Sequence, residues 1–151
     1  MRVQDMEKTM QHAPTLNTSG NQASPHDAAA VVDEYLRRLM IPDPDAAREL
    51  AAPGLEIRFT GDPAQCAAFN AGRYAWVKKR IEATEVVSGA SDDHAVVYSR
   101  GTLYGAWPDG TPFEGNRYVD RYVVRHGLIT RMDVWNDSAE WLLTRAGLAR
   151  D

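Results

Sequence analysis

The chain has 151 residues, of which 44% are hydrophobic and 25% are charged, and its formal net charge is −4. These values are typical of one globular domain, and the negative charge argues against nucleic acid or an anionic membrane as the partner. The one cysteine, Cys66, leaves no pair for a disulfide or a cysteine metal site, and no stretch is long and apolar enough for a signal peptide or a membrane span. The sequence therefore predicts a cytoplasmic protein.

The N-terminal half is predicted to be mainly helical. Residues 1–23 are polar and lack apolar periodicity, which indicates a mobile tail ahead of a domain over residues 24–151. A helix starts at Ser24–Pro25, a shorter one starts near Asp45 and ends at the Pro-Gly pair 53–54, and "LEIRFTG" (55–61) alternates as a strand. The stretch "DPAQCAAFNAGRYAWVKKRIEA" (62–83) is predicted as a third helix, with Cys66, Asn70, Tyr74, Val77 and Ile81 on one stripe.

The C-terminal half changes to the two-residue period of strands. A short strand is predicted at 85–90 and three longer ones at 94–107, 113–124 and 128–136, joined by turns. Strands this long must bend, and Gly101 and Gly105 are the expected bending points. Asp137 or Ser138 caps a final helix that ends at Gly147. Helices gathered on one face of a curved, mainly antiparallel sheet define an α+β fold with a hollow suited to a small molecule.

One acid lies inside the last predicted strand. Asp133 stands between Met132 and Val134, and period-two alternation puts Arg131 and Trp135 on the same face as the acid. Alternation does not say which face is turned inward. Asp133 is therefore either a cavity carboxylate or an outside acid that is exposed or paired with Arg131 or Arg100.

The element order and the ending "DRYVVRHGLITRMDVWNDSAEWLL" (120–143) resemble the nuclear-transport-factor-2-like (NTF2-like), ketosteroid-isomerase-like superfamily, and within it the SnoaL-like proteins, which include polyketide cyclases. The resemblance covers about residues 26–148. It implies a cone-shaped α+β barrel, and it turns Asp133 and Trp135 into the cavity. Because this superfamily includes enzymes, binding modules and structural partners, the resemblance does not fix the function.

The resemblance also implies a set of pocket residues. Asp133 would be the acid or base, and Tyr104, Tyr118 and Asn116 would donate hydrogen bonds to a developing enolate oxygen. The substrate would further contact Trp135, Arg100, Thr102, Tyr98, Tyr74, Asn70, Tyr35, Phe59 and Asp120. Two copies would associate through the outer sheet face, where Arg117, Val119, Arg121 and Val123 would lie.

Other chemistries match the sequence less well. In limonene epoxide hydrolase an Arg–x–Asp pair stands where this chain has Arg100–Gly101–Thr102, and a Tyr–x–Asn pair stands where it has Ile57–Arg58–Phe59. No two histidines have metal-ligand spacing, and a set of pocket histidines like that of the dehydratases is missing. We therefore expect a cofactor-independent lyase, isomerase or cyclase without a metal, acting on a small hydrophobic carbonyl compound. The alternatives are a non-catalytic ligand-binding or accessory module and, less favoured, an epoxide hydrolase.

Overall fold

The computed structural model describes residues 25–41, 44–59, 72–88 and 94–147. The predicted tail over 1–23, the capping Ser24, and Cys66 and Asn70 of the predicted third helix lie outside these residues. The described elements are α1 (Pro25–Leu39), α2 (Pro44–Arg48), β1 (Ala51–Phe59), β2 (Trp76–Ser88), β3 (His94–Ala106), β4 (Pro112–Arg125), β5 (Leu128–Asn136) and α4 (Ser138–Arg145). Within the described residues, no helix is long and apolar enough to cross a membrane.

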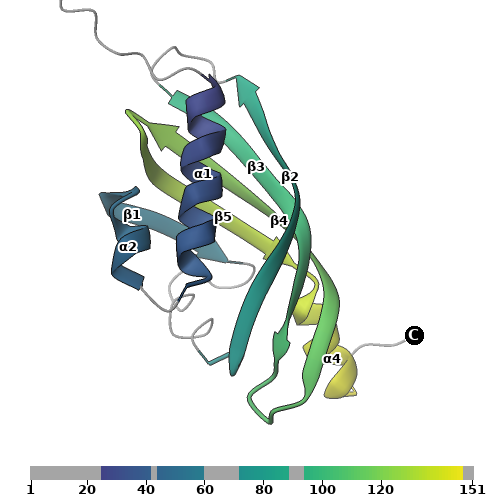
Figure 1. The fold of residues 1–151 in the computed structure, drawn as a ribbon. Helices are drawn as coiled ribbons and strands as arrows, with labels where there is room; N and C mark the ends of the chain where they lie inside the picture. The colour runs from purple at the N-terminus through teal and green to yellow at the C-terminus, as the bar shows by residue number, and fades with distance from the viewer. Residues whose placement is uncertain (1–24, 42–43, 60–71, 89–93, 148–151) are drawn as a thin grey trace, which may run out of the picture.

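The five strands form one strongly curved sheet in the order β1-β5-β4-β3-β2. β1 pairs with β5 in parallel, and the other three neighbouring pairs are antiparallel. Figure 1 shows α1 lying over one face of this sheet, α2 beside β1, and α4 at the far end of the long strands. This is the predicted α+β arrangement, in which helices cover one face of a curved, mixed but mainly antiparallel sheet.

Helix α1 covers the inner face of the sheet because its apolar residues recur at helical spacing. Ala28, Val32, Tyr35 and Leu36 are all buried. They pack against inward side chains of the strands, which are Val97, Tyr122, Val124, Ile129, Met132 and Val134. On the solvent side of α1, Glu34 forms ion pairs with Arg37 and Arg38. The main hydrophobic core is therefore the layer between α1 and the sheet.

The predicted helix over 62–83 is wrong in its described part, because residues 72–75 form a turn and residues 76–88 form the strand β2. Val77 and Ile81 are four residues apart, so they share a strand face as readily as a helical stripe. Nearly every residue of β2 pairs with β3, from Trp76 with Ala106 to Ser88 with Ala95. The pairing of this long ladder outweighs the local helical pattern. The short strand predicted at 85–90 is part of β2 as far as Ser88, and its last two residues lie outside the described part of the chain.

At Gly101 and Gly105, β2 lies too close to β3 for a side chain to fit. A Cβ at Gly101 would overlap the backbone carbonyl oxygen of Arg80, and one at Gly105 would overlap that of Trp76. Both glycines are buried and leave room for the curvature of the sheet. That the long strands bend at these two positions stays a prediction.

Candidate functional site

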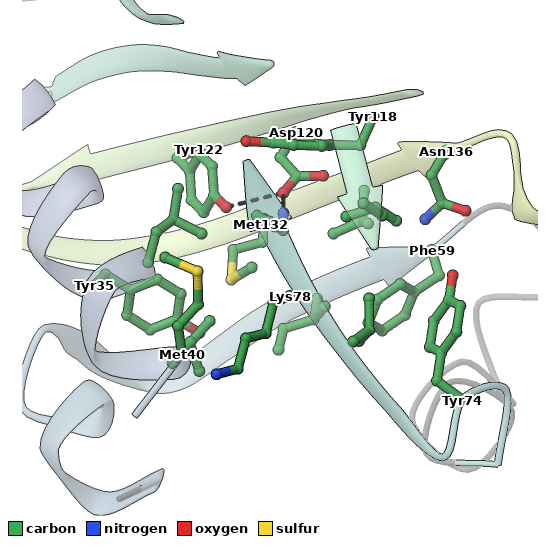
Figure 2. A pocket seen from close by; sticks show the side chains of 17 residues that line it. Tyr35, Met40, Phe59, Tyr74, Lys78, Tyr118, Asp120, Tyr122, Met132 and Asn136 are labelled. Atoms are coloured by element: carbon green, nitrogen blue, oxygen red, sulfur yellow. Dashed lines mark hydrogen bonds and ion pairs between the residues drawn. The ribbon is translucent and has the colours of Figure 1, made fainter. Parts of the chain in front are cut away.

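A cavity of about 340 Å³ lies between α1, the start of β2 and the inner face of the sheet. Most of its wall is apolar, from residues such as Leu36, Met40, Phe59, Met132 and Val134. Its polar and charged lining residues are Tyr35, Tyr74, Lys78, Lys79, Tyr118, Asp120, Tyr122 and Asn136. Figure 2 shows Tyr35 and Met40 toward one end of the cavity, Tyr74 and Asn136 toward the other, and Asp120 between them. An apolar hollow with a few converging polar groups is the usual form of a small-molecule site.

Asp120 is the acid of this cavity. It lies in the middle of β4, where Tyr118, Asp120 and Tyr122 alternate inward, and its side chain has no exposed surface. Its Oδ2 forms an ion pair with the ammonium of Lys79 from β2 and accepts a hydrogen bond from the Tyr122 hydroxyl at 3.0 Å. Its Oδ1 is also buried and has no partner among the described residues. One carboxylate oxygen is thus held by two groups, and the other has no partner among the described residues.

Burial sets the protonation of the groups around Asp120. It raises the pKa of the Asp120 carboxyl, and the nearby Lys79 ammonium and the Tyr122 hydrogen bond oppose this rise. Burial also raises the pKa of Tyr118, Tyr35 and, more strongly, Tyr122, and the charge of Asp120 adds to each rise. The three phenols therefore stay protonated, and Tyr122 donates to Asp120, whose carboxylate is more basic than usual.

A second polar group closes the other end of the cavity. The Tyr74 hydroxyl hydrogen-bonds to Ser138 at the start of α4, and Asn116 Nδ2 donates to the same Ser138 oxygen at 3.2 Å. Asn136 Oδ1 accepts the backbone N–H of Ser138 at 3.1 Å. Tyr74 also stacks on Trp107, with ring centroids 5.6 Å apart. These contacts fix α4 against the cavity end, and they are the role the structure gives to Asn116, which does not itself line the cavity.

The inward orientation predicted for Asp133 requires correction. Met132 and Val134 line the cavity and belong to the core, whereas Asp133 lies on the opposite face of β5. Its carboxylate accepts from Arg121 Nη1 at 3.0 Å and from Arg131 Nε at 3.0 Å. The physical reason is the partner of β5: α1 presents an apolar face, so the apolar residues of β5 turn toward it.

Other predicted pocket residues also lie on the outer face. On β3, Val97, Ser99, Gly101 and Leu103 are buried toward the inside, so the alternate residues Tyr98, Arg100, Thr102 and Tyr104 point outward. Arg100 lies near Glu82, and the Tyr104 ring lies under the Arg80 guanidinium. Trp135, which shares the face of Asp133, is 47% exposed. These five residues are therefore corrected from the cavity wall to the outside of the sheet.

The structure does bring together five of the predicted residues around the cavity, which are Tyr35, Phe59, Tyr74, Tyr118 and Asp120. Sequence reasoning missed Lys79, Tyr122 and Asn136. A signal for the correct face was present in β4, where Arg117, Arg121 and Arg125 alternate with Tyr118 and Tyr122. Since arginines rarely face a core, the residues between them point inward, and Asp120 is one of these. The described residues contain no group of three or more His, Cys, Asp or Glu arranged to hold a metal ion.

Comparisons with known proteins agree with this fold. No protein-family model and no curated protein matches the sequence. Among solved structures, an NTF2-like protein of unknown function from Burkholderia pseudomallei has a TM-score of 0.60 at 13% identity, over 77% of this chain and 95% of the other. A candidate SnoaL-like polyketide cyclase from Jannaschia sp. CCS1 has a TM-score of 0.57 at 20% identity, over 83% and 94%. TerC, co-crystallised with polyporic acid, has a TM-score of 0.57 at 15% identity, over 77% and 95%.

These similarities identify the class of fold to which the chain belongs. The chain has the curved α+β architecture of NTF2-like and SnoaL-like proteins, as the resemblance in its sequence predicted.

Proposed function

We propose that the chain is a cofactor-independent enzyme of the cyclase, isomerase or lyase type, in which Asp120 moves a proton at a carbon next to a carbonyl group of a small hydrophobic substrate. The observation that carries this proposal is the free Oδ1 of Asp120, a fully buried carboxylate oxygen without a partner among the described residues, at the wall of an apolar cavity. A buried acceptor is costly without a donor, so the site is built for a ligand that brings a proton to it.

The proposed step begins with the carbonyl compound in the cavity. Oδ1 of Asp120 takes a proton from the carbon, and the C–H electrons form a carbon–carbon double bond while the carbonyl oxygen becomes negative. Burial favours this step because it raises the pKa of the Asp120 carboxyl. The enolate then takes the proton back at another carbon, expels a leaving group or attacks a second carbonyl carbon, which are respectively isomerase, lyase and cyclase chemistry. General base catalysis of this kind contributes about 100-fold to 10,000-fold in rate.

Two of the structural neighbours support a small-molecule role. One is a candidate polyketide cyclase, and the other was crystallised with polyporic acid. At 20% and 15% identity, these proteins share the fold of this chain, and that similarity does not transfer their ligands or reactions to it. The cavity of about 340 Å³ is of the size of known small-ligand sites.

Proton exchange tests the proposal without knowledge of the natural substrate. A panel of hydrophobic ketones and β-dicarbonyl compounds is incubated with the protein in D2O, and loss of the α-proton signal is followed by NMR. We expect the wild type to accelerate exchange of some members, and Asp120→Asn to remove this acceleration.

Asp133→Asn is the matched control, because it removes the other buried acid of the sheet, which lies on the outer face. We expect folded Asp133→Asn protein to keep the exchange activity. Exchange that survives in Asp120→Asn and disappears in Asp133→Asn would contradict the proposal and restore the acid on β5 as the base.

The ion pair of Asp120 with Lys79 favours one alternative, a non-catalytic module that binds a polar ligand in the same cavity. Under this alternative, panel members bind to the wild type, but no member exchanges its α-protons faster than in buffer. Asp120→Asn would then change only the affinity.

A further inference from the structure

Lys79 is the second charged group in contact with Asp120. It projects inward from β2, and its side chain is 20% exposed, whereas that of Asp120 is fully buried. Its Nζ lies 4.1 Å from the centroid of the Tyr118 ring and forms an ion pair with Oδ2 of Asp120. Figure 2 shows Asp120 at the cavity wall with the hydrogen bond from Tyr122 to the same oxygen. The ammonium is therefore held at the place where proton removal would occur.

Proton removal changes the charge that Lys79 faces. Before the step, the Asp120–Lys79 pair consists of one negative carboxylate and one positive ammonium, and the substrate beside it is neutral. After it, Asp120 is neutral, and the negative charge lies on the substrate oxygen. An ammonium without a partner costs free energy in an apolar cavity, and an oxyanion without a partner does so for the same reason. The two charges compensate each other only if Lys79 changes its partner.

We propose that Lys79 is a further catalytic residue, which passes its ion pair from Asp120 to the enolate oxygen as Asp120 takes the proton. When Asp120 is protonated and Lys79 is charged, the cavity is then a site for planar oxyanions such as enolates and phenolates. This inference rests on the proposed function, since it assigns the electrophilic partner of the same proton transfer. The net charge of the three groups is zero before and after the step, so no charge has to enter the apolar cavity.

The groups that face Asp120 identify the residue that takes up a proton when an oxyanion binds. Lys79 faces it from β2, Tyr118 and Tyr122 from β4, and Tyr35 from α1, and the ammonium of Lys78 also lines the cavity. On β3 the paired residue is Ser99, whose hydroxyl bonds to Tyr118, and from β5 the inward residues are Met132 and Val134. The tyrosines are protonated and the β3 and β5 residues do not titrate. A proton taken up when an oxyanion binds therefore goes to Asp120.

The test uses the full chain and 4-nitrophenol, whose absorption distinguishes the phenol from the phenolate. Titration calorimetry in buffers of different ionisation enthalpy counts the protons taken up, at pH values where the free probe is already ionised. We expect the wild type to bind the phenolate with uptake of about one proton, so that its affinity falls by about tenfold for each rise of one pH unit.

The variants separate the roles of the two residues. We expect Lys79→Met to weaken phenolate binding by roughly 30-fold or more, and Lys79→Arg to retain most of it, because the cation is the required element. Asp120→Asn, which resembles the protonated acid, should bind the phenolate without proton uptake. Arg80→Met is the control for charge, since Arg80 lies on the same strand but pairs with Glu114 on the outer face, and it should bind as the wild type does. Circular dichroism confirms that each variant is folded.

Three results would overturn the proposal: no binding of the phenolate to the wild type, binding without proton uptake, or equal affinity in folded Lys79→Met. Its failure can be told apart from failure of the proposed function. If α-proton exchange requires Asp120 and continues at the wild-type rate in Lys79→Met, then Asp120 is the base and Lys79 is not its partner. If the phenolate binds as expected but no panel member exchanges, the oxyanion site stands without the catalytic role.

Discussion

Lys79 on β2 and Asp120 on β4 form an ion pair that spans β3, the strand between them. Lys79 pairs in the ladder with Leu103, and Asp120 pairs with Ser99. The inward residue between these two positions is Gly101, which has no side chain to separate the two charges. A buried ion pair of this kind contributes little net stability when it is complete, but loss of one partner leaves an uncompensated charge.

Replacement of Lys79 by Met is therefore expected to destabilise the fold at neutral pH. The carboxylate of Asp120 would be left buried with only the Tyr122 hydrogen bond, and we expect a loss of about 3 kcal/mol in the free energy of unfolding. Urea denaturation at pH 7 measures this loss. Arg80→Met is the control, because the Arg80–Glu114 pair is exposed and its loss should cost less than about 1 kcal/mol. Equal losses in the two variants would contradict the prediction.

A double variant tests the origin of this loss. Lys79→Met combined with Asp120→Asn removes both charges, so the penalty for a buried unpaired carboxylate disappears. We expect the double variant to be more stable than Lys79→Met alone by roughly 1–3 kcal/mol, measured by the same denaturation. If the double variant is the less stable of the two, packing of the lysine stem, rather than charge, explains the loss.

The stability of the wild type relative to Asp120→Asn should fall as the pH rises. Burial raises the pKa of Asp120 above the ordinary 3.8, so the folded state holds the proton more tightly than the unfolded state. The resulting stability is complete below pH 3.8 and is lost as the pH rises through the folded pKa, by about 1.4 kcal/mol for each unit that separates the two pKa values. Urea denaturation of both proteins from pH 3 upward measures the difference.

The comparison with Asp120→Asn is needed because other acids have the opposite sign. Two arginines, Arg37 and Arg38, lower the pKa of Glu34 to about 2, so its contribution is lost as the pH falls from 4.5 toward that value. Both proteins carry Glu34, and its effect cancels in the difference. A relative stability that rises with pH would show that Lys79 outweighs burial at Asp120.

The fold was predictable because its strands and helices have distinct hydrophobic periods. Helix α1 and strands β3, β4 and β5 lie where the sequence placed them, and α2 ends earlier than predicted, at Arg48. β1 begins at Ala51, before the Pro53–Gly54 pair that was predicted to end a helix. β2 was mistaken in part for a helix, because its identity depends on the long ladder with β3, which no local pattern encodes.

The site was less predictable because it depends on which face of each strand is covered. Alternation groups Asp133 with Trp135, and Tyr118 with Asp120, but alternation alone does not decide which pair is enclosed under α1. The arginines of β4 indicate that Arg121 faces outward. Its partners in the ladder, Tyr98 on β3 and Asp133 on β5, then face outward as well. The cross-strand ion pair between Arg121 and Asp133 was therefore accessible from the sequence, whereas the contact between Lys79 and Asp120 across β3 was not.

Gly101→Ala is expected to disturb the sheet at its tightest point. The added methyl would overlap the Arg80 carbonyl oxygen, which is backbone and cannot move without separation of β2 from β3. We expect a loss of about 2–3 kcal/mol in the free energy of unfolding, together with weaker binding of probes in the cavity. Gly110→Ala is the control: Gly110 has open space around it and a φ of +84°, so its replacement adds only the backbone cost, about 1–2 kcal/mol. A stable Gly101→Ala protein with normal binding would show that the curvature does not require glycine there.

The outer face of the sheet is expected to hold a second copy of the chain. Trp135 and Val119 face each other across β5 and β4 and are 47% and 42% exposed, which leaves a paired apolar surface open to water. Next to them the carboxylate of Asp133 is shared by Arg121 and Arg131, which leaves one net positive charge beside this apolar pair. We expect sedimentation velocity to show a dimer for the wild type and a monomer for Trp135→Lys, because a lysine at this position would place a charge in the interface. Ile41→Lys, at a similarly exposed apolar residue just beyond the end of α1, is the control and should remain dimeric. A monomeric wild type, or a Trp135→Lys protein that dimerises as strongly as the wild type, would exclude this face as the contact between copies.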